Sequence, residues 1–578
     1  MKKKIFLAIF ILAILCVTIV KHVFVSDLPI VANIALGVDD ALMINITKHL
    51  SNGEWVGGYN DARLSKGLTF PLMLAACHSF NIDYITMMNT LYTLACLLII
   101  WVISKKIDNK FFLFVIYTVL LFTPIMYSYQ VMQRIYRNAI IPSFAILIIT
   151  GYIYLLLSRN NGKYFLRILA SILTGVVLAL FWYTREDSIW MIPYIAFMSL
   201  SLIVAVLVKN KKFNLELFKN LILLIIPIVL VFGYRHILCV QNEKHFGVYT
   251  VYNNESYNKA IKSLKKVKKY DYYDNIDFTV EKLKRVAEVS CLKQIYPTLE
   301  GLVYGYSLFD SSPEEGEVAN GWFPWALKAA LNQYGYYNSA ENTNLFFNTF
   351  HADIEKALAE GKLEYEDVKP NLTMQLKKLY DATVLTVKGV MKYDDIYFNG
   401  KPIEYEDSQK EACLEFYEYT GNSLLLVDKE SKQIVNLTNN EDGYNEKILN
   451  KTNIIENLIN IYQKVNLVTF CLAIVLYVIY TIVVFIKLFK KDLSEFEMWA
   501  IISGILGAMV TLMMGIAYET AFNAYVITAM YLSAVYPFML MFSIIMIGQF
   551  IKLIYEFIKL KKEIKHEPVE KEIEVKES

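Results

Sequence analysis

The chain has 578 residues, of which 56% are hydrophobic and 19% are charged, and its mean hydropathy is +0.37. This composition is hard to reconcile with a soluble globular protein and predicts that much of the chain lies in a lipid bilayer. The net charge of +2 gives no indication of a nucleic-acid partner, and the sequence contains no P-loop or dinucleotide-binding fingerprint.

Apolar segments of about 17 to 25 residues, the length that a helix needs to cross roughly 30 Å of hydrocarbon, occur along most of the chain. Ten such segments lie near residues 5–25, 84–104, 111–129, 138–158, 165–183, 188–208, 217–239, 464–488, 495–517 and 523–551. The first follows a basic start, so a signal peptide is the alternative. No small-x-small cleavage site follows it convincingly, which favours an uncleaved anchor.

Lysine and arginine residues in alternate short loops predict the orientation, because positive charge is retained on the cytoplasmic side. Both termini are therefore expected in the cytoplasm of a multi-pass cell-membrane protein. The expected fold class is an α-helical polytopic membrane protein with a mainly α, α+β extracytoplasmic domain. The predicted parts are a transmembrane module over 1–239 with a first external loop over 26–83, an extracytoplasmic domain over 240–463, C-terminal transmembrane helices over 464–556 and a charged cytoplasmic tail over 557–578.

The insert over 240–463 is rich in Lys, Glu, Asp, Asn and Tyr and is long enough to form its own core. Apolar residues at helical spacing predict helices within 323–337 and 344–363, and the segment 423–438 is typical of two short strands around a polar turn. Cys291 and Cys413 are the insert's cysteines, so one disulfide is possible there.

Four aromatic residues of the insert allow two interpretations. They are Trp322, Trp325, Tyr336 and Tyr337. They pack in the core of the insert, or they present flat faces to a glycan or protein acceptor.

An adjacent acidic pair, Asp39 and Asp40, opens a helical segment in the first external loop. Leu42, Ile46 and Leu50 share one face of this helix, so we expect it to lie along the membrane surface and to hold both carboxylates at the level of the lipid headgroups. The alternative is helix capping, which needs only one of the two carboxylates.

The other predicted external turns carry arginines and carboxylates. They are Arg134, Arg137, Arg185, Glu186, Asp187 and Glu519. Arg134 and Arg137 are three apart, which predicts one shared helix face just before a span. External arginines run against the positive-inside bias, and the planar guanidinium matches phosphate oxygens. The alternative is that each arginine pairs with a nearby carboxylate and ties the loops together.

With these features the chain resembles multi-spanning glycosyltransferases of the GT-C superfamily, relatives of the protein mannosyltransferases and the aminoarabinose transferases. The resemblance rests on DDALMINITKHL, the following GEW, the KGLTFPLML segment and seven spans before the insert. It covers roughly residues 1–240 and, more loosely, the spans after 463. Those enzymes use a polyprenyl-phosphate sugar and an acceptor on the outer or lumenal face. The interrupting insert departs from the best-known members and leaves the acceptor open.

The resemblance implies transfer of a hexose or pentose from a polyprenyl-phosphate donor to a glycan, lipid or protein acceptor of the cell envelope, by an inverting single displacement. Asp39 matches the first acidic residue of the family's loop pair and is the expected base, with Asp40 beside it. The expected ligands of the departing phosphate are Lys66, Arg134, Arg137 and Arg185. The expected groups that orient the sugar or acceptor, or help to bind a divalent cation, are Glu186, Asp187 and Glu519. Metal use stays open.

The alternative function is a transporter or flippase, or a non-catalytic polymer-handling membrane protein. Coupled transporters bury ionisable residues near the membrane midplane. The central parts of the predicted spans carry essentially none, while charges collect at the external surface. This distribution favours the glycosyltransferase, which meets the headgroup of a membrane lipid at that surface.

Overall fold

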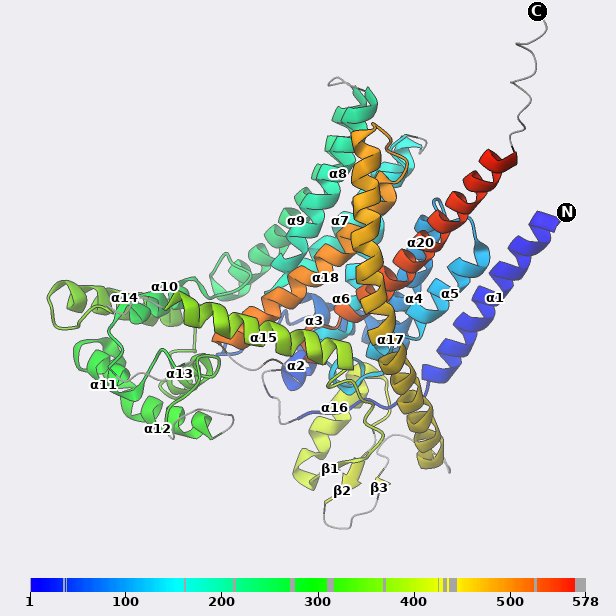
Figure 1. Ribbon diagram of the computed structural model, residues 1–578. Helices are drawn as coiled ribbons and strands as arrows, with labels where there is room; N and C mark the ends of the chain where they lie inside the picture. The colour runs from blue at the N-terminus through cyan, green and yellow to red at the C-terminus, as the bar shows by residue number, and fades with distance from the viewer. Residues whose placement is uncertain are drawn as a thin grey trace, which may run out of the picture.

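The computed structural model confirms a polytopic helical membrane protein (Figure 1). It describes residues 2–34, 37, 39–160, 163–210, 215–270, 276–308, 316–366, 371–424, 426–429, 434–435, 444–523, 526 and 528–566. Within this part of the chain, ten helices are long and apolar enough to cross a membrane, as predicted. They are formed by α1 (Lys2–Val25), α4 (Tyr84–Ile103), α5 (Lys110–Leu121), α6 (Ile141–Leu157), α7 (Tyr164–Trp182), α8 (Ile192–Asn210), α9 (Leu215–Phe246), α17 (Tyr444–Phe489), α18 (Phe496–Phe522) and α20 (Val535–His566).

Burial differs strongly among these helices. Nearly every residue of α6 is buried, because it packs against α4, α7 and α8. Gly151 of α6 lies so close to Thr174 of α7 that a methyl group there would meet the threonine side chain. By contrast, α1 leaves large apolar side chains such as Phe6 and Leu12 exposed, as expected of a helix that faces lipid.

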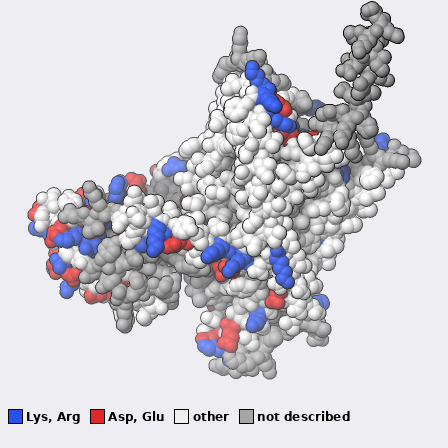
Figure 2. Space-filling model, in the orientation of Figure 1, with Lys and Arg blue, Asp and Glu red and all other residues white. Residues whose placement is uncertain are grey.

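The start of α1 and the end of α20 lie at one end of the helix bundle, and the insert lies at the other (Figure 1). Figure 2 shows the visible face of the bundle as a largely uncharged band, with charged side chains gathered at its upper end and over the insert. This arrangement agrees with an even number of crossings and separates the insert from both ends of the chain.

The insert contains two parts with different cores. Its helices are α10 (Glu255–Lys266), α11 (Val280–Val289), α12 (Tyr296–Ser307), α13 (Phe323–Gln333), α14 (Ala340–Ala359), α15 (Leu372–Lys392) and α16 (Lys410–Thr420). The helices α10–α14, here called the helical unit, enclose a hydrophobic core of their own. The later part, from α15 to the strands, instead contributes residues such as Phe398 and Phe416 to the core of the membrane helices.

A three-stranded sheet belongs to this later part. β1 (Ile403–Tyr405) pairs in parallel with β2 (Leu426–Asp428), and β2 pairs antiparallel with β3 (Ile434–Val435). The two strands predicted within 423–438 are thus confirmed, although residues 430–433 of their turn lie outside the described residues. The disulfide that the sequence allowed is not formed. Cys291 and Cys413 are both free, and they pack against two different cores.

The helix after the acidic pair, α2 (Asp40–Ser51), is covered by protein along its whole length, and none of its residues is exposed. It packs against α3 (Thr69–Ser79) and against α16 of the insert. Met43 and Ile44 are therefore buried together with the predicted apolar face. Lys48 of α2 also forms an ion pair of 2.5 Å with Glu415 of α16. The amphipathic pattern identified the apolar face but not the insert helix that covers α2.

Candidate functional site

The two carboxylates of the acidic pair have different environments. Asp40 is fully buried, and its carboxylate accepts hydrogen bonds from Arg134 Nη2 at 2.6 Å and Nε at 3.0 Å. Burial raises the pKa of Asp40 to about 6, although the hydrogen bond and the charge of Arg134 oppose this rise. Asp39 is 22% exposed and lies 3.5 Å from Lys66 Nζ and 3.4 Å from Arg134 Nη2. Its side chain makes no capping hydrogen bond, so helix capping does not explain it.

Arg134 and Arg137 point to different partners and do not share a helix face, contrary to the prediction from their spacing. A π-helical turn over Tyr129–Gln133 ends at Arg134, which is extended, and a 3-10 turn begins only at Arg137. The extended backbone between them separates the two side chains. Arg134 therefore reaches the acidic pair, whereas Arg137 reaches Glu186.

Tyr136, between the two arginines, connects the two groups of charges. Its hydroxyl accepts a hydrogen bond of 3.3 Å from Lys66 Nζ and one of 3.2 Å from Arg137 Nε. Nothing in the sequence pattern singled out this tyrosine. Tyr136 is buried and contacts Lys66, Arg134 and Arg137, so its role in the site is visible only in the folded chain.

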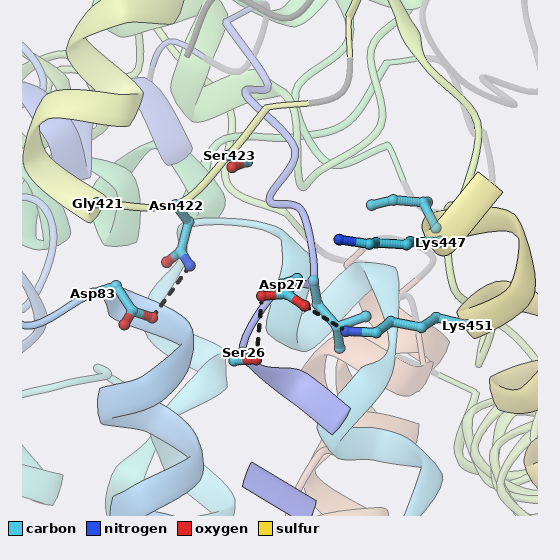
Figure 3. A pocket seen from close by; sticks show the side chains of 10 residues that line it. Ser26, Asp27, Asp83, Gly421, Asn422, Ser423, Lys447 and Lys451 are labelled. Atoms are coloured by element: carbon cyan, nitrogen blue, oxygen red, sulfur yellow. Dashed lines mark hydrogen bonds and ion pairs between the residues drawn. The ribbon is translucent and has the colours of Figure 1, made fainter. Parts of the chain in front are cut away.

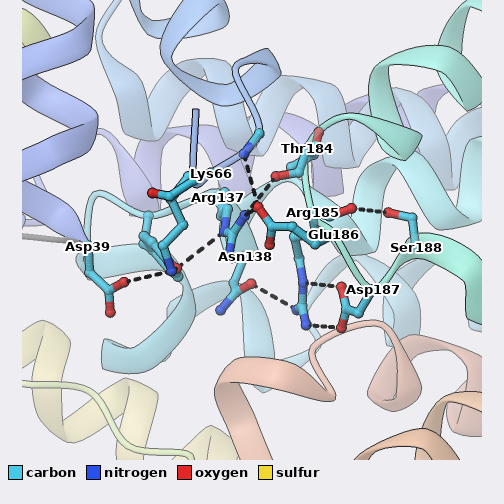
Figure 4. A network of polar contacts seen from close by, with 12 residues as sticks. Asp39, Lys66, Arg137, Asn138, Thr184, Arg185, Glu186, Asp187 and Ser188 are labelled. Carbon is cyan, nitrogen blue, oxygen red and sulfur yellow. Dashed lines mark hydrogen bonds and ion pairs between the residues drawn. The ribbon is translucent and has the colours of Figure 1, made fainter. Parts of the chain in front are cut away.

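The turn between α7 and α8 supplies the second group of charges (Figure 4). Glu186 Oε1 accepts hydrogen bonds from Arg137 Nη1 at 2.6 Å and from the backbone N–H of Gly67 at 3.1 Å. Burial acts to raise the pKa of Glu186, but Arg137 and then Lys66 hold it below its usual value. Arg185 binds both oxygens of Asp187 and donates to Asn138 Oδ1 at 2.9 Å. Arg134, Arg137 and Arg185 thus each have a carboxylate partner, as expected if arginine–carboxylate pairs tie the loops together.

A cavity of about 420 Å³ lies between this turn, the helical unit and α18. Its lining residues are Arg137, Arg185, Glu186, Asp187, Gly321, Trp322, Trp325, Ile516, Glu519, Asn523, Val526 and Tyr531. The structure therefore gathers five of the nine predicted site residues around one cavity. Lys66 is connected to the cavity wall through the hydroxyl of Tyr136, which also accepts a hydrogen bond from Arg137. Asp39 pairs with Lys66 and Arg134, and Asp40 is buried against Arg134.

Core packing accounts for three of the four aromatic residues of the insert, Trp322, Tyr336 and Tyr337, and acceptor binding stays a prediction. Trp322 and Trp325, one helical turn apart at the start of α13, line the cavity. Tyr336 and Tyr337 pack against or within the core of the helical unit. Among the described residues, no group of three or more His, Cys, Asp or Glu side chains is placed to hold a metal ion. Glu519 instead accepts a hydrogen bond of 2.5 Å from Asn523.

A second pocket, of about 210 Å³, lies where α1, α4, the sheet segment and α17 meet (Figure 3). Its polar residues are joined to one another: Asp27 pairs with Lys451 at 3.2 Å, and Asn422 donates to Asp83 at 3.2 Å. Asp83 also caps α4 through the N–H of Thr86. These contacts hold four segments together and include none of the predicted site residues.

No protein-family model matches the chain. No curated protein matches it either. Among solved structures, the chain is similar to ArnT from Cupriavidus metallidurans in the apo state, with 12% sequence identity and a TM-score of 0.29 over 90% of this chain and 78% of that one. It is also similar to the same protein bound to undecaprenyl phosphate, with 11% identity, a TM-score of 0.29 and the same coverage.

Proposed function

We propose that the chain is a membrane glycosyltransferase that transfers a sugar from a polyprenyl-phosphate donor to an acceptor on the insert side of the membrane. One observation carries this proposal. Asp39, the accessible carboxylate of the pair, is held between Lys66 and Arg134 beside a cavity lined by charged and tryptophan side chains. A carboxylate next to cations at the end of a helix bundle suits a substrate that carries a phosphate on a lipid anchor.

In the proposed reaction, Asp39 takes the proton of the acceptor hydroxyl or amine as that atom bonds to the anomeric carbon. The bond from the anomeric carbon to the phosphate oxygen breaks, and its electron pair leaves with the phosphate. Attack from the opposite side inverts the anomeric centre. Lys66 and Arg137 stabilise the charge that grows on the phosphate.

The buried residues of the set have positioning roles in this proposal. Each guanidinium nitrogen of Arg134 has a protein acceptor, and Asp40 binds two of them. Asp40 thus holds Arg134, and Arg134 holds Asp39. The nitrogens of Arg185 are likewise bonded to Asp187 and Asn138. We assign to Glu186, Asp187 and Glu519 the orientation of sugar or acceptor hydroxyls in the cavity.

The topology belongs to the same proposal. We place both termini in the cytoplasm and the 240–463 insert outside it, with the cavity at the external surface. The donor then remains anchored in the bilayer while its phosphate and sugar reach the cavity, and the acceptor arrives from the aqueous side. The division into a transmembrane module, an insert, C-terminal spans and a charged tail is retained as predicted.

The test is sugar transfer by protein reconstituted in vesicles with a panel of labelled polyprenyl-phosphate sugars. We expect Asp39→Asn to lower kcat by about 10²- to 10⁴-fold, the usual contribution of a general base. Asp27→Asn is the matched control, because Asp27 is an exposed aspartate of the same loop that lies in the other pocket. Labelled lipid that crosses the bilayer with its sugar–phosphate bond intact, and without transfer, would establish the transporter instead.

A further inference from the structure

The helical unit brings a lysine to the candidate site. Lys328 lies on α13 one turn after Trp325, and its ammonium is 5.2 Å from the centre of the Trp325 ring. The ammonium of Lys66, from the first external loop, is 5.6 Å from the same ring. Within the described part of the chain, the ammonium of Lys328 has no ion pair or hydrogen bond. Two cations from distant segments therefore share one indole at the edge of the cavity.

This arrangement is unfavourable without a further partner. Two like charges that share a partly buried site repel each other, and each loses hydration. Burial, followed by the charge of Lys66, lowers the pKa of Lys328 to about 8, although Asp61 and Glu186 act in the opposite direction. The only acidic group paired with Lys66 is Asp39, at 3.5 Å, among the residues described here. An anion between the two lysines would offset both costs.

Hydrogen bonds hold α13 against the membrane helices at this position. The N–H of Gly321 donates to the carbonyl of Asn523 at 3.3 Å, and Asn320 Nδ2 donates to the carbonyl of Phe522 at 3.3 Å. Asn320 is itself tied to the N–H of Asp277 at 2.7 Å. The start of α13 is therefore attached to the end of α18, and Lys328 is held beside Trp325, which lines the cavity.

We propose that Lys328 of the insert and Lys66 of the first loop bind between them the phosphate group of the lipid-linked donor. This inference rests on the proposed function and adds to it that the donor site is complete only when the helical unit is docked. Lysine suits this task as a compact charge with three donors. The Trp325 ring, which lines the cavity and lies near both ammonium groups, would contact the sugar next to the phosphate.

The test is binding of polyprenyl monophosphate to the full chain in lipid nanodiscs, compared with neutral polyprenol, phosphatidylglycerol and inorganic phosphate. We expect Lys328→Gln to weaken the binding of polyprenyl phosphate at least tenfold and to leave the binding of polyprenol unchanged. Lys328→Arg, which keeps the charge, restores binding to within a few fold. Lys293→Gln is the matched control, because Lys293 is an exposed lysine of the same unit. Equal melting temperatures of the variants establish that they fold.

The pH dependence of binding gives a second readout. A bound phosphate favours the charged form of Lys328, whose pKa is lowered to about 8 in the free protein. Binding should therefore weaken as the pH rises above about 8, where Lys328 loses its proton. Lys328→Arg should weaken this dependence, since arginine stays charged, and leave only the part that comes from Lys66, whose pKa is also lowered by burial. A lysine with a merely structural role would not produce this change.

The outcomes separate this inference from the proposed function. Undiminished binding of polyprenyl phosphate to Lys328→Gln would overturn the inference, while loss of transfer in Asp39→Asn would still support the enzyme. If binding of polyprenyl phosphate requires Lys328 but the protein has no transfer activity, the proposed phosphate site is supported and the proposed transferase function is wrong. Equally tight binding of phosphatidylglycerol or inorganic phosphate would overturn the assignment of the site to the donor.

Discussion

Asp39 and Asp40 are neighbours in the sequence, yet the start of α2 sends them into different surroundings. Asp40 is fully buried against Arg134, and Asp39 remains 22% exposed near Lys66. An isolated buried charge is strongly unfavourable, and removing one partner of a buried pair leaves the other uncompensated. The buried member thus stabilises the local geometry, and the exposed member is the one that the proposed substrate would reach.

The pKa of Asp40 leads to a prediction about the pH dependence of transfer. This pKa is raised to about 6, so Asp40 gains a proton as the pH falls through that value and then no longer neutralises Arg134. We expect kcat/KM to fall below about pH 6 for this reason. Asp40→Asn should have low activity at every pH and lack this decline. The measurement is the pH profile of kcat/KM, and an unchanged acid limb in Asp40→Asn would contradict the assignment.

Some residues of the site could be predicted from the sequence and others could not. The acidic pair and the arginines stand out because charged side chains are rare beside apolar spans. Tyr136 and Lys328 are ordinary residues in their own segments and become significant only through contacts with distant parts of the chain. Lys21 is a similar case: it resembles a lysine at the end of a span, but it is buried with its ammonium 3.5 Å from the Tyr127 ring centre.

At the scale of elements, the spans were predictable because length and hydropathy alone determine whether a helix can cross a bilayer. The surroundings of α2 were not, since they depend on α16, which lies more than 350 residues later in the chain. The break between Arg134 and Arg137 was also hidden, because a spacing of three carries no sign that the backbone becomes extended.

Gly67 joins the loop that precedes α3 to the turn between α7 and α8. A Cβ at this position would lie 2.3 Å from the carbonyl oxygen of Tyr183 and 2.6 Å from that of Thr184. Gly67→Ala should therefore push the loop away, break the hydrogen bond to Glu186 and displace Lys66. We expect a loss of kcat/KM of about tenfold to a hundredfold, since small misplacements in a site have effects of this size.

The same loop offers a matched control for this substitution. Gly58 has open space around its Cβ position and an ordinary backbone conformation. Gly58→Ala should keep wild-type kinetics, and both variants should insert in the membrane to the same extent. Wild-type activity in Gly67→Ala would show that the contact between loop and turn has no part in the reaction.

At the scale of the whole molecule, the two ends of the chain lie opposite the insert (Figure 1). Labelling of introduced cysteines with a membrane-impermeant thiol reagent tests the proposed orientation, in a chain where Cys291 is replaced by serine. Lys293→Cys should react in intact cells, because it is exposed on the insert. Lys490→Cys, exposed between α17 and α18 at the other end, should react only after permeabilisation. The reverse pattern would invert the topology.

The 46-residue helix α17 is continuous from the insert side through the membrane. At 1.5 Å per residue it is about 69 Å long, more than twice the hydrocarbon thickness of about 30 Å. We expect a continuous helix of this length to hold the sheet part of the insert at a fixed position relative to the bilayer. The helical unit has its own core and begins after Gly247, whose φ of +71° ends α9. We therefore expect that a hinged swing of that unit as one body would first have to break the hydrogen bonds of Gly321 and Asn320 to the end of α18, and that it would then carry Lys328 away from Lys66.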